Sequence, residues 1–294
     1  MTSGFETDTS ERVRLLLRVP VTRLRVVGAE HGYQHLTATL ADGREVFAKA
    51  AIGSGGGHAV AFAAEANGLR WLAEAGTVPV PEVLAVDEHV LVLELLPPGH
   101  PTQAAASEFG AGLARLHASG APSFGAPWPG YIASLPLDNT AGREWAAWYA
   151  EQRLVPYLRK ARDYGALSGA DVSLVETVVA RIGELAGPAE PPGRIHGDLW
   201  SGNVLWSGGR GWLVDPAAHG GHRETDLAML ALFGAPHLEV MLRGYTEAAP
   251  LADGWRDRVP LHQLHPLLVH ACLYGASYAG QVRAAARLAL RAAG

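Results

Sequence analysis

The sequence contains little cysteine, and it has neither a long apolar run nor an apolar leader. Its single cysteine, Cys272, can neither close an internal disulfide nor supply a cysteine zinc cluster. No uncharged apolar run reaches the roughly 18 residues of a membrane-spanning helix. The first ten residues are polar and carry Glu6 and Asp8, unlike a secretory signal. We therefore expect a soluble, cytoplasmic protein that does not bind membranes.

Basic charge is also scarce, because 24 lysine and arginine residues face 29 acidic residues and the formal net charge is −5. Only two of the basic residues are lysines, Lys49 and Lys160. Scattered basic residues lack the concentrated positive footprint that general nucleic-acid binding requires. With 48% hydrophobic and 18% charged residues, the chain can bury a large core. Its 294 residues favour two lobes or one large domain.

The chain begins with strand patterns. Residues 24–27, 35–40 and 45–50 alternate or form short apolar runs, and a turn signal at 41–43 predicts an antiparallel meander. Glycine-rich residues 53–57 break this pattern without matching a P-loop. Apolar spacing then predicts a helix over 58–75, followed by a strongly apolar strand over 90–96.

After Pro97 the pattern becomes mostly helical. Helices are expected over 104–119, 144–162, 170–186 and most of 225–294, with one small hairpin joining 204–206 to 212–214. We therefore predict an α+β, bilobal fold. Residues 1–97 would form a small antiparallel sheet lobe with one helix, and residues 98–294 a larger, mainly helical lobe.

One short run of residues carries most of the chemistry. It extends from His196 to Asn203 and reads H-G-D-L-W-S-G-N, and Asp215 follows after the predicted hairpin. Phosphoryl transfer from ATP uses one carboxylate to accept the hydroxyl proton, and an amide plus a second carboxylate to hold magnesium. The D-x-x-x-x-N spacing is typical of a kinase catalytic loop. We therefore expect Asp198 to be the base, and Asn203 and Asp215 to be Mg²⁺ ligands.

Two residues of the first lobe complete this pattern. Lys49 ends the third predicted strand, and Glu65 lies on the apolar face of the next helix, between Phe62 and Leu69. A carboxylate there requires a cationic partner or a raised pKa. In kinases a strand lysine paired with a helix glutamate contacts the ATP phosphates. Taken singly, these polar residues could be turns or caps, but all five together favour a kinase.

These motifs resemble the fructosamine (ketosamine) kinase family, in the aminoglycoside-phosphotransferase and choline-kinase branch of the protein-kinase-like fold. The resemblance rests on residues 196–203, on D-P-A at 215–217 and on G-H-R-E-T-D-L-A-M at 221–229, and it extends over about 46–281. It implies ATP- and Mg²⁺-dependent phosphorylation of the sugar 3-hydroxyl of ketosamines, as small molecules or on glycated protein lysines. The unstable product would then release the amine, which amounts to deglycation.

The resemblance also implies roles for further residues. The interlobe hinge, whose backbone would bind adenine, corresponds to Glu94, Leu95 and Leu96. His196 and Asp226 would support the catalytic loop. The substrate side would be lined by Trp200, His219 and His222. The spacing of the two histidines could instead indicate a metal site, with Glu224 and Asp226 nearby.

The expected nucleotide loop, residues 28–35, departs from the family pattern. It reads G-A-E-H-G-Y-Q-H and contains no cysteine, so a disulfide-linked dimer through this loop is excluded. Glu30 would repel phosphates unless it points away. Two alternatives stay open: a kinase for aminoglycosides, choline or homoserine, and an inactive nucleotide-binding regulator. The sequence does not specify the sugar, the amine or the oligomeric state.

Overall fold

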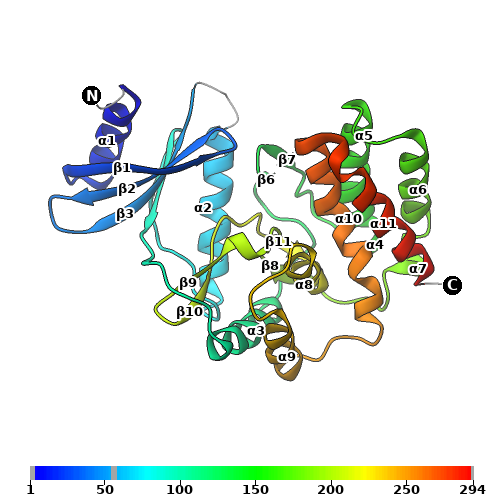
Figure 1. Cartoon of the computed structure of the whole chain (residues 1–294). Helices are drawn as coiled ribbons and strands as arrows, with labels where there is room; N and C mark the ends of the chain where they lie inside the picture. Colours follow the sequence, from blue (N-terminus) through cyan, green and yellow to red (C-terminus); the bar gives the residue numbers. More distant parts are fainter. Residues whose placement is uncertain (1–3, 54–57, 293–294) are drawn as a thin grey trace.

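The computed structural model describes residues 4–53 and 58–292, so residues 54–57 of the predicted glycine-rich break lie outside the described part. A sheet-bearing N-terminal lobe stands beside a larger helical lobe (Figure 1). The sheet is antiparallel throughout, with the order β1-β2-β3-β5-β4. Its strands are β1 (Val21–Glu30), β2 (Tyr33–Leu40), β3 (Glu45–Ala51), β4 (Val83–Val86) and β5 (Val90–Glu94). The predicted α+β architecture is confirmed.

Two helices pack on opposite faces of this sheet. Alternate residues of β5 point to opposite faces, and Leu91 packs with Phe62 of α2 (His58–Glu74). On the other face Val92 packs with Val13 of α1 (Gly4–Leu17). The expectation of a single helix in this lobe was wrong. Helix α1 is mostly polar, and Thr9 and Val13 are the buried side chains among those described for it, so its apolar periodicity is weak.

The chain passes from β5 to α3 (Gln103–Ala118) through residues 95–102. The side chain of Thr102 caps α3 by accepting a hydrogen bond from the Ala105 N–H at 3.1 Å. The predicted lobe boundary at residues 97/98 lies within this connection, and the division into domains stays a prediction.

The second lobe is mainly helical, and two buried clusters hold it together. The larger cluster joins the helices from α4 to α7 to α10 and α11, and the second packs α3 and α9 against the β9–β10 hairpin. The helix predicted over 144–162 is interrupted by a π-helical turn at Ala150–Leu154. The helices are α4 (Trp145–Tyr149), α5 (Val155–Asp163), α6 (Gly169–Ala180), α7 (Ile182–Leu185), α8 (Arg223–Leu232), α9 (Leu238–Ala248), α10 (Trp255–Tyr274) and α11 (Ala279–Arg291).

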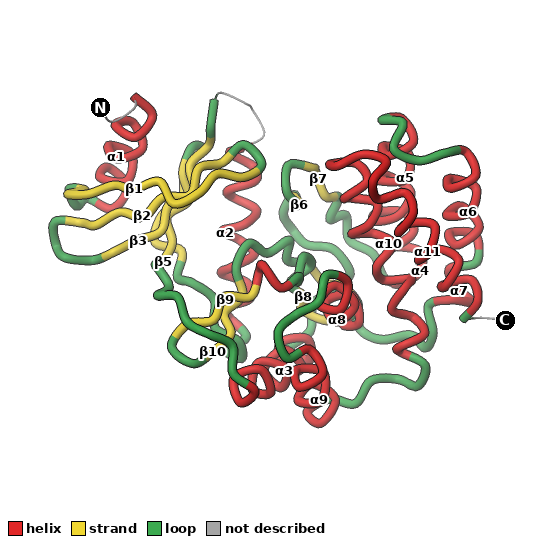
Figure 2. The backbone as a smooth tube through the Cα atoms, in the orientation of Figure 1, coloured by secondary structure: helices red, strands yellow, loops and turns green. Residues whose placement is uncertain are grey.

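Within residues 58–292, three small two-stranded sheets accompany these helices. They pair β6 (Gly130–Ile132) with β7 (Leu135–Leu137), β8 (Gly193–Ile195) with β11 (His219–Gly221), and β9 (Val204–Ser207) with β10 (Arg210–Leu213). In Figure 2, β8 lies between the N-terminal sheet and the C-terminal helices, and the β9–β10 hairpin lies below the sheet, beside α3. Among the described helices, none combines the length and the apolar character needed to cross a membrane.

Candidate active site

The loop that follows β8 is anchored by a buried carboxylate. Asp226, in α8, is fully buried and accepts hydrogen bonds from the backbone N–H groups of His196 at 2.7 Å and Gly197 at 2.9 Å. The Nε2 atom of His117 lies 3.1 Å from the same carboxylate. Burial alone would raise the pKa of Asp226, but the hydrogen bond from His117 and its neighbours hold that pKa below the ordinary value. An ionised carboxylate therefore positions the start of the loop.

His196 and Gly197 shape the next step of the loop. The His196 ring accepts a hydrogen bond from the Asp198 N–H at Nδ1 and donates one from Nε2 to the Val214 carbonyl, at 3.2 and 2.9 Å. Gly197 has a φ of 83°, and a Cβ atom there would lie 2.3 Å from the Ala217 carbonyl oxygen. Only glycine fits both constraints. The backbone thus presents Asp198 in one orientation.

The β9–β10 hairpin brings two potential metal ligands together. Asn203 donates from Nδ2 to the Asp198 carbonyl at 2.8 Å and to its carboxylate at 3.2 Å. The Val214 N–H donates to the Asn203 carbonyl at 3.1 Å. This hydrogen bond closes the hairpin, so that Asp215 and Asn203 line one cavity. Asp215 adopts a left-handed φ of 51°, a strained conformation typical of functional sites.

Lys49 forms two ion pairs, one within its own lobe with Glu65 and one across the lobes with Asp215. Its Nζ atom lies 2.8 Å from Glu65 Oε2 and 2.6 Å from Asp215 Oδ1. Burial raises the pKa of Glu65 to about 8 despite Lys49, whereas the attraction of Lys49 outweighs burial and lowers the pKa of Asp215. The Asp215 side chain is 43% exposed and that of Glu65 only 11%. Asp215 is therefore the more exposed of the two carboxylates, and Lys49 favours its ionised form.

One cavity of about 120 Å³ is lined by the predicted residues Lys49, Glu65, Asp198, Asn203 and Asp215. Burial, together with the nearby charge of Asp215, raises the pKa of Asp198 to about 7. The lining includes residues from both lobes: Glu30, His31, Tyr33, His35, Lys49, Glu65, Tyr131, Asp198, Trp200, Asn203 and Asp215. The structure thus brings together residues that lie far apart in the sequence, such as Glu30 and Asp215.

A second cavity, of about 330 Å³, adjoins the first and shares Asp198 and Trp200 with it. Trp200 is 37% exposed, and its ring lies over Gly202, where a Cβ atom would approach the ring to 2.1 Å. The other walls are mostly apolar or aromatic: Ile132, Met229, Phe233, Pro266, Val269, His270, Leu273, Tyr274 and Tyr278. A small organic molecule could therefore bind directly beside the Asp198 carboxylate.

The donor set of the first cavity fits a magnesium ion. Mg²⁺ prefers carboxylate and amide oxygens, and Asn203 and Asp215 present these groups on one wall. Asn203 uses its Nδ2 atom for hydrogen bonds to Asp198, so its Oδ1 atom can turn to a cation. Asp215 receives Lys49 at Oδ1, which leaves its second oxygen for a ligand.

His219 and His222 do not reach either cavity. They are 4% and 3% exposed and line a small interior space behind the loop, beside Trp145 and Trp148. Burial lowers the pKa of both histidines to about 3. Because β11 pairs with β8, it places His219 in the interior, and His222 follows it as the buried N-cap of α8. Their expected position on the substrate side therefore needs correction.

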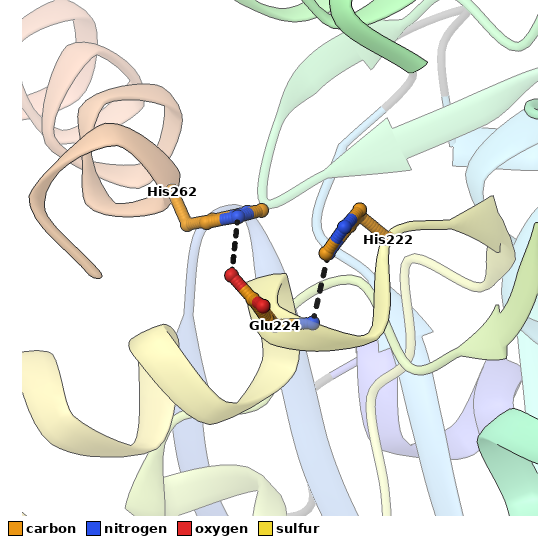
Figure 3. A group of neighbouring side chains, drawn as sticks. All are labelled: His222, Glu224 and His262. Atoms are coloured by element: carbon orange, nitrogen blue, oxygen red, sulfur yellow. Dashed lines mark hydrogen bonds and ion pairs between the residues drawn. The ribbon is translucent and has the colours of Figure 1, made fainter. Parts of the chain in front are cut away.

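The alternative metal site around His222 also has a simpler explanation. Ligand atoms of His222, Glu224 and His262 lie within 4.8 Å of one another (Figure 3). However, Arg258 donates to both oxygens of Glu224, at 2.6 and 2.9 Å. His222 Nδ1 accepts a hydrogen bond from the Glu224 N–H at 3.2 Å. A guanidinium already neutralises this carboxylate and would repel a cation, so the group anchors the start of α8.

The predicted hinge residues lie at the junction of the lobes. Glu94 ends β5 opposite Val46, and its N–H donates to the Glu82 carbonyl at 2.9 Å. Leu95 and Leu96 are half-buried in the connection to α3. Their proposed contact with adenine stays a prediction.

Three supporting residues were not predicted from the sequence: His117, Arg258 and Tyr274. Each lies in a helix outside any motif. The available signal was weak: His117 falls on the buried face of α3 beside Leu113 and Leu116, where a polar side chain needs a partner.

Comparisons with known proteins agree with this geometry. A model of the fructosamine kinase family matches residues 25–292. A probable ketoamine kinase of Klebsiella aerogenes is 36% identical over 222 residues, which span 74% of this chain and 76% of the relative. A structure assigned as a fructosamine-3-kinase of Thermobifida fusca is 51% identical, with a TM-score of 0.93 over 96% of this chain and 98% of that one.

More distant structures share the fold alone. The choline kinase LicA of Streptococcus pneumoniae is 16% identical, with a TM-score of 0.65 over 98% of this chain and 100% of that one. The bilobal architecture is therefore kinase-like, as in the aminoglycoside-phosphotransferase and choline-kinase structures. The family model covers most of the sequence, and the chain belongs to the fructosamine kinase family.

Proposed function

We propose that this protein is an ATP- and Mg²⁺-dependent kinase that phosphorylates the 3-hydroxyl of a ketosamine sugar. One observation carries the proposal. The first cavity is lined by Lys49, Asp198, Asn203 and Asp215, and it adjoins a second cavity whose walls are mostly apolar and aromatic side chains. The first cavity would take the ATP phosphates and the second the acceptor. Membership of the family supports a ketosamine as that acceptor.

In the proposed reaction, the acceptor oxygen attacks the γ-phosphorus of ATP. The new O–P bond forms as the bond to the β,γ-bridging oxygen breaks, and ADP leaves with that oxygen. Asp198 in its ionised form accepts the hydroxyl proton. Lys49 binds the α- and β-phosphates, held in place by Glu65. Asn203 and Asp215 would hold a magnesium ion, which would supply positive charge to the phosphates.

The product would carry phosphate on the carbon next to the ketone. Such a product can eliminate phosphate and then release the amine by hydrolysis, which is the chemical basis of the proposed deglycation. The acceptor could be a free ketosamine or a glycated lysine of a protein.

The composition of the second cavity discriminates between other acceptors. Its lining includes Glu30 and Asp198 as carboxylates, among mainly aromatic and aliphatic side chains. A polycationic aminoglycoside would require a stronger acidic surface. Choline is the second candidate, because aromatic walls such as Trp200, Tyr274 and Tyr278 suit a quaternary ammonium group. An inactive regulator is disfavoured because the reactive residues are all present.

A substrate panel tests the proposal. Purified protein with ATP and Mg²⁺ is offered erythrulosamine, ribulosamine and fructosamine derivatives, together with choline, homoserine and an aminoglycoside. ADP release and phosphorus NMR of the products are measured, with Asp198→Asn as the inactive control. We expect phosphorylation at the sugar 3-hydroxyl. Turnover of choline alone would replace the ketosamine assignment, and turnover of no acceptor would refute it.

A further inference from the structure

The turn between β1 and β2 has an unusual conformation at its tip. His31 and Gly32 both have positive φ angles, 49° and 86°, and lie between the paired residues Glu30 and Tyr33. Two central residues with positive φ define a type I′ hairpin turn, which is short and well ordered. A histidine in this region is strained. Its position therefore requires compensating contacts.

One such contact crosses from the N-terminal lobe to the helical lobe. The Nε2 atom of His31 lies 3.0 Å from the hydroxyl oxygen of Tyr274, which ends α10. Its Nδ1 atom lies 3.5 Å from a carboxylate oxygen of Glu30. With hydrogen on Nδ1, the ring accepts from Tyr274 while facing Glu30. His31 is thus a partner for Glu30 within the same turn. This contact explains how the expected nucleotide loop accommodates an acidic residue.

The contact also lies at the boundary between the two cavities. His31 lines the first cavity together with Lys49 and the second together with Trp200. On the other side, the Tyr274 ring packs near His270 and Tyr278, with ring centroids 5.5 and 5.9 Å apart. A change at this hydrogen bond therefore reaches walls of both cavities.

We propose that the His31–Tyr274 hydrogen bond is a clasp between the lobes that couples nucleotide binding to acceptor binding. The clasp holds the β1–β2 turn over the first cavity and fixes Tyr274 as a wall of the second. Both residues are positioning residues and take no part in proton transfer. The proposal rests on the proposed function for the assignment of nucleotide and acceptor to the two cavities.

Two conservative substitutions test the clasp. Tyr274→Phe removes only the hydroxyl group, and His31→Asn removes the ring while keeping a residue that tolerates left-handed φ. The control is Tyr164→Phe, which removes a hydroxyl from a residue that is 63% exposed at the end of α5. The net free energy of a single hydrogen bond corresponds to a change of roughly two- to tenfold in a binding constant. We expect each test variant to raise KM for both ATP and acceptor by about this factor, with kcat changed less than twofold.

The double variant measures the interaction between His31 and Tyr274 directly. If the two residues act through one bond, His31→Asn with Tyr274→Phe should be no more impaired than the worse single variant. Multiplicative effects of the two substitutions on KM would overturn the clasp. A Tyr274→Phe enzyme that matches the Tyr164→Phe control in both KM values would overturn it as well.

Hydrogen exchange separates the clasp from the proposed function. Backbone amides of residues 28–35 should exchange faster in both test variants than in wild type and the control, because the turn is released. ADP with Mg²⁺ should also bind the test variants more weakly. These measurements need no acceptor. Failure of the whole substrate panel would therefore refute the proposed function, whereas hydrogen exchange and ADP binding would still test the clasp. Unchanged exchange and ADP affinity would overturn it.

Discussion

The hydrogen bonds of Asp226 yield the sharpest prediction for the loop that carries Asp198. Asp226→Asn keeps the size of the side chain but replaces one acceptor oxygen with an NH₂ group. The carboxylate now serves the N–H groups of His196 and Gly197 through different oxygens. An asparagine can accept from only one of them, and its NH₂ group then faces the other N–H, donor against donor.

The magnitude follows from these contacts. One buried backbone N–H would lose its partner, at a cost of about 1–3 kcal/mol, and the remaining bonds would lose the strength of a charged acceptor. We therefore expect Asp226→Asn to lower the free energy of unfolding by about 2–4 kcal/mol. Because the same N–H groups position the residues before Asp198, kcat should fall by at least about tenfold, while the protein stays folded.

Urea denaturation followed by circular dichroism measures the stability change, and initial rates measure kcat. Asp163→Asn is the matched control, because that carboxylate is 61% exposed and pairs with its sequence neighbour Arg162 at 2.8 Å. The folded pKa of Asp226 lies below its ordinary value of 3.8. Its stabilisation is therefore present above pH 3.8 and is lost as pH falls through the folded pKa. A decrease in the free energy of unfolding of less than about 0.5 kcal/mol, the size typical of surface substitutions, would contradict this prediction.

Three further predictions concern charge. Because burial and Asp215 raise the pKa of Asp198 to about 7, kcat/KM in a pH–rate profile should fall as pH drops below about 7; a flat profile from pH 8 to 5.5 would contradict this. Lys49→Arg should lower kcat/KM at least about tenfold with unchanged thermal stability, since a planar guanidinium replaces a compact ammonium poorly; wild-type kinetics would contradict the assignment. The hydrogen bond from Arg283 lowers the pKa of Asp171 to about 2. Arg283→Ala should therefore destabilise the protein at pH 7 in urea denaturation, and this destabilisation should shrink as pH falls from 3.8 towards 2.

Much of the candidate site could be predicted from sequence because its spacing is local. The separation of Asp198 and Asn203 is set by one loop, and the turn signals before Asp215 indicated the returning hairpin. The burial of Glu65 was visible in helical periodicity, because helix faces repeat every 3.6 residues. The family and the bilobal fold could also be predicted from the sequence, because the motifs and the periodicity of helices and strands are local patterns.

The errors have a common physical cause. His222 belongs to a motif and His219 lies close to it, but both are buried, because β11 pairs with β8 and His222 caps the start of α8. Helix α1 lacked a clear apolar stripe, and its partner surface on the sheet exists only after β2, β3 and β5 have paired. Neither feature follows from local periodicity.

The sequence by itself determined which chemical groups this protein possesses: one functional lysine candidate, a D-x-x-x-x-N loop and a returning aspartate. Only the tertiary structure decided which groups meet. The close approach of Lys49 to Asp215, the anchoring of the loop by Asp226 and the contact of His31 with Tyr274 each join residues from different elements. Such contacts depend on how helices and strands pack, and packing is a property of the assembled core rather than of any short stretch of chain.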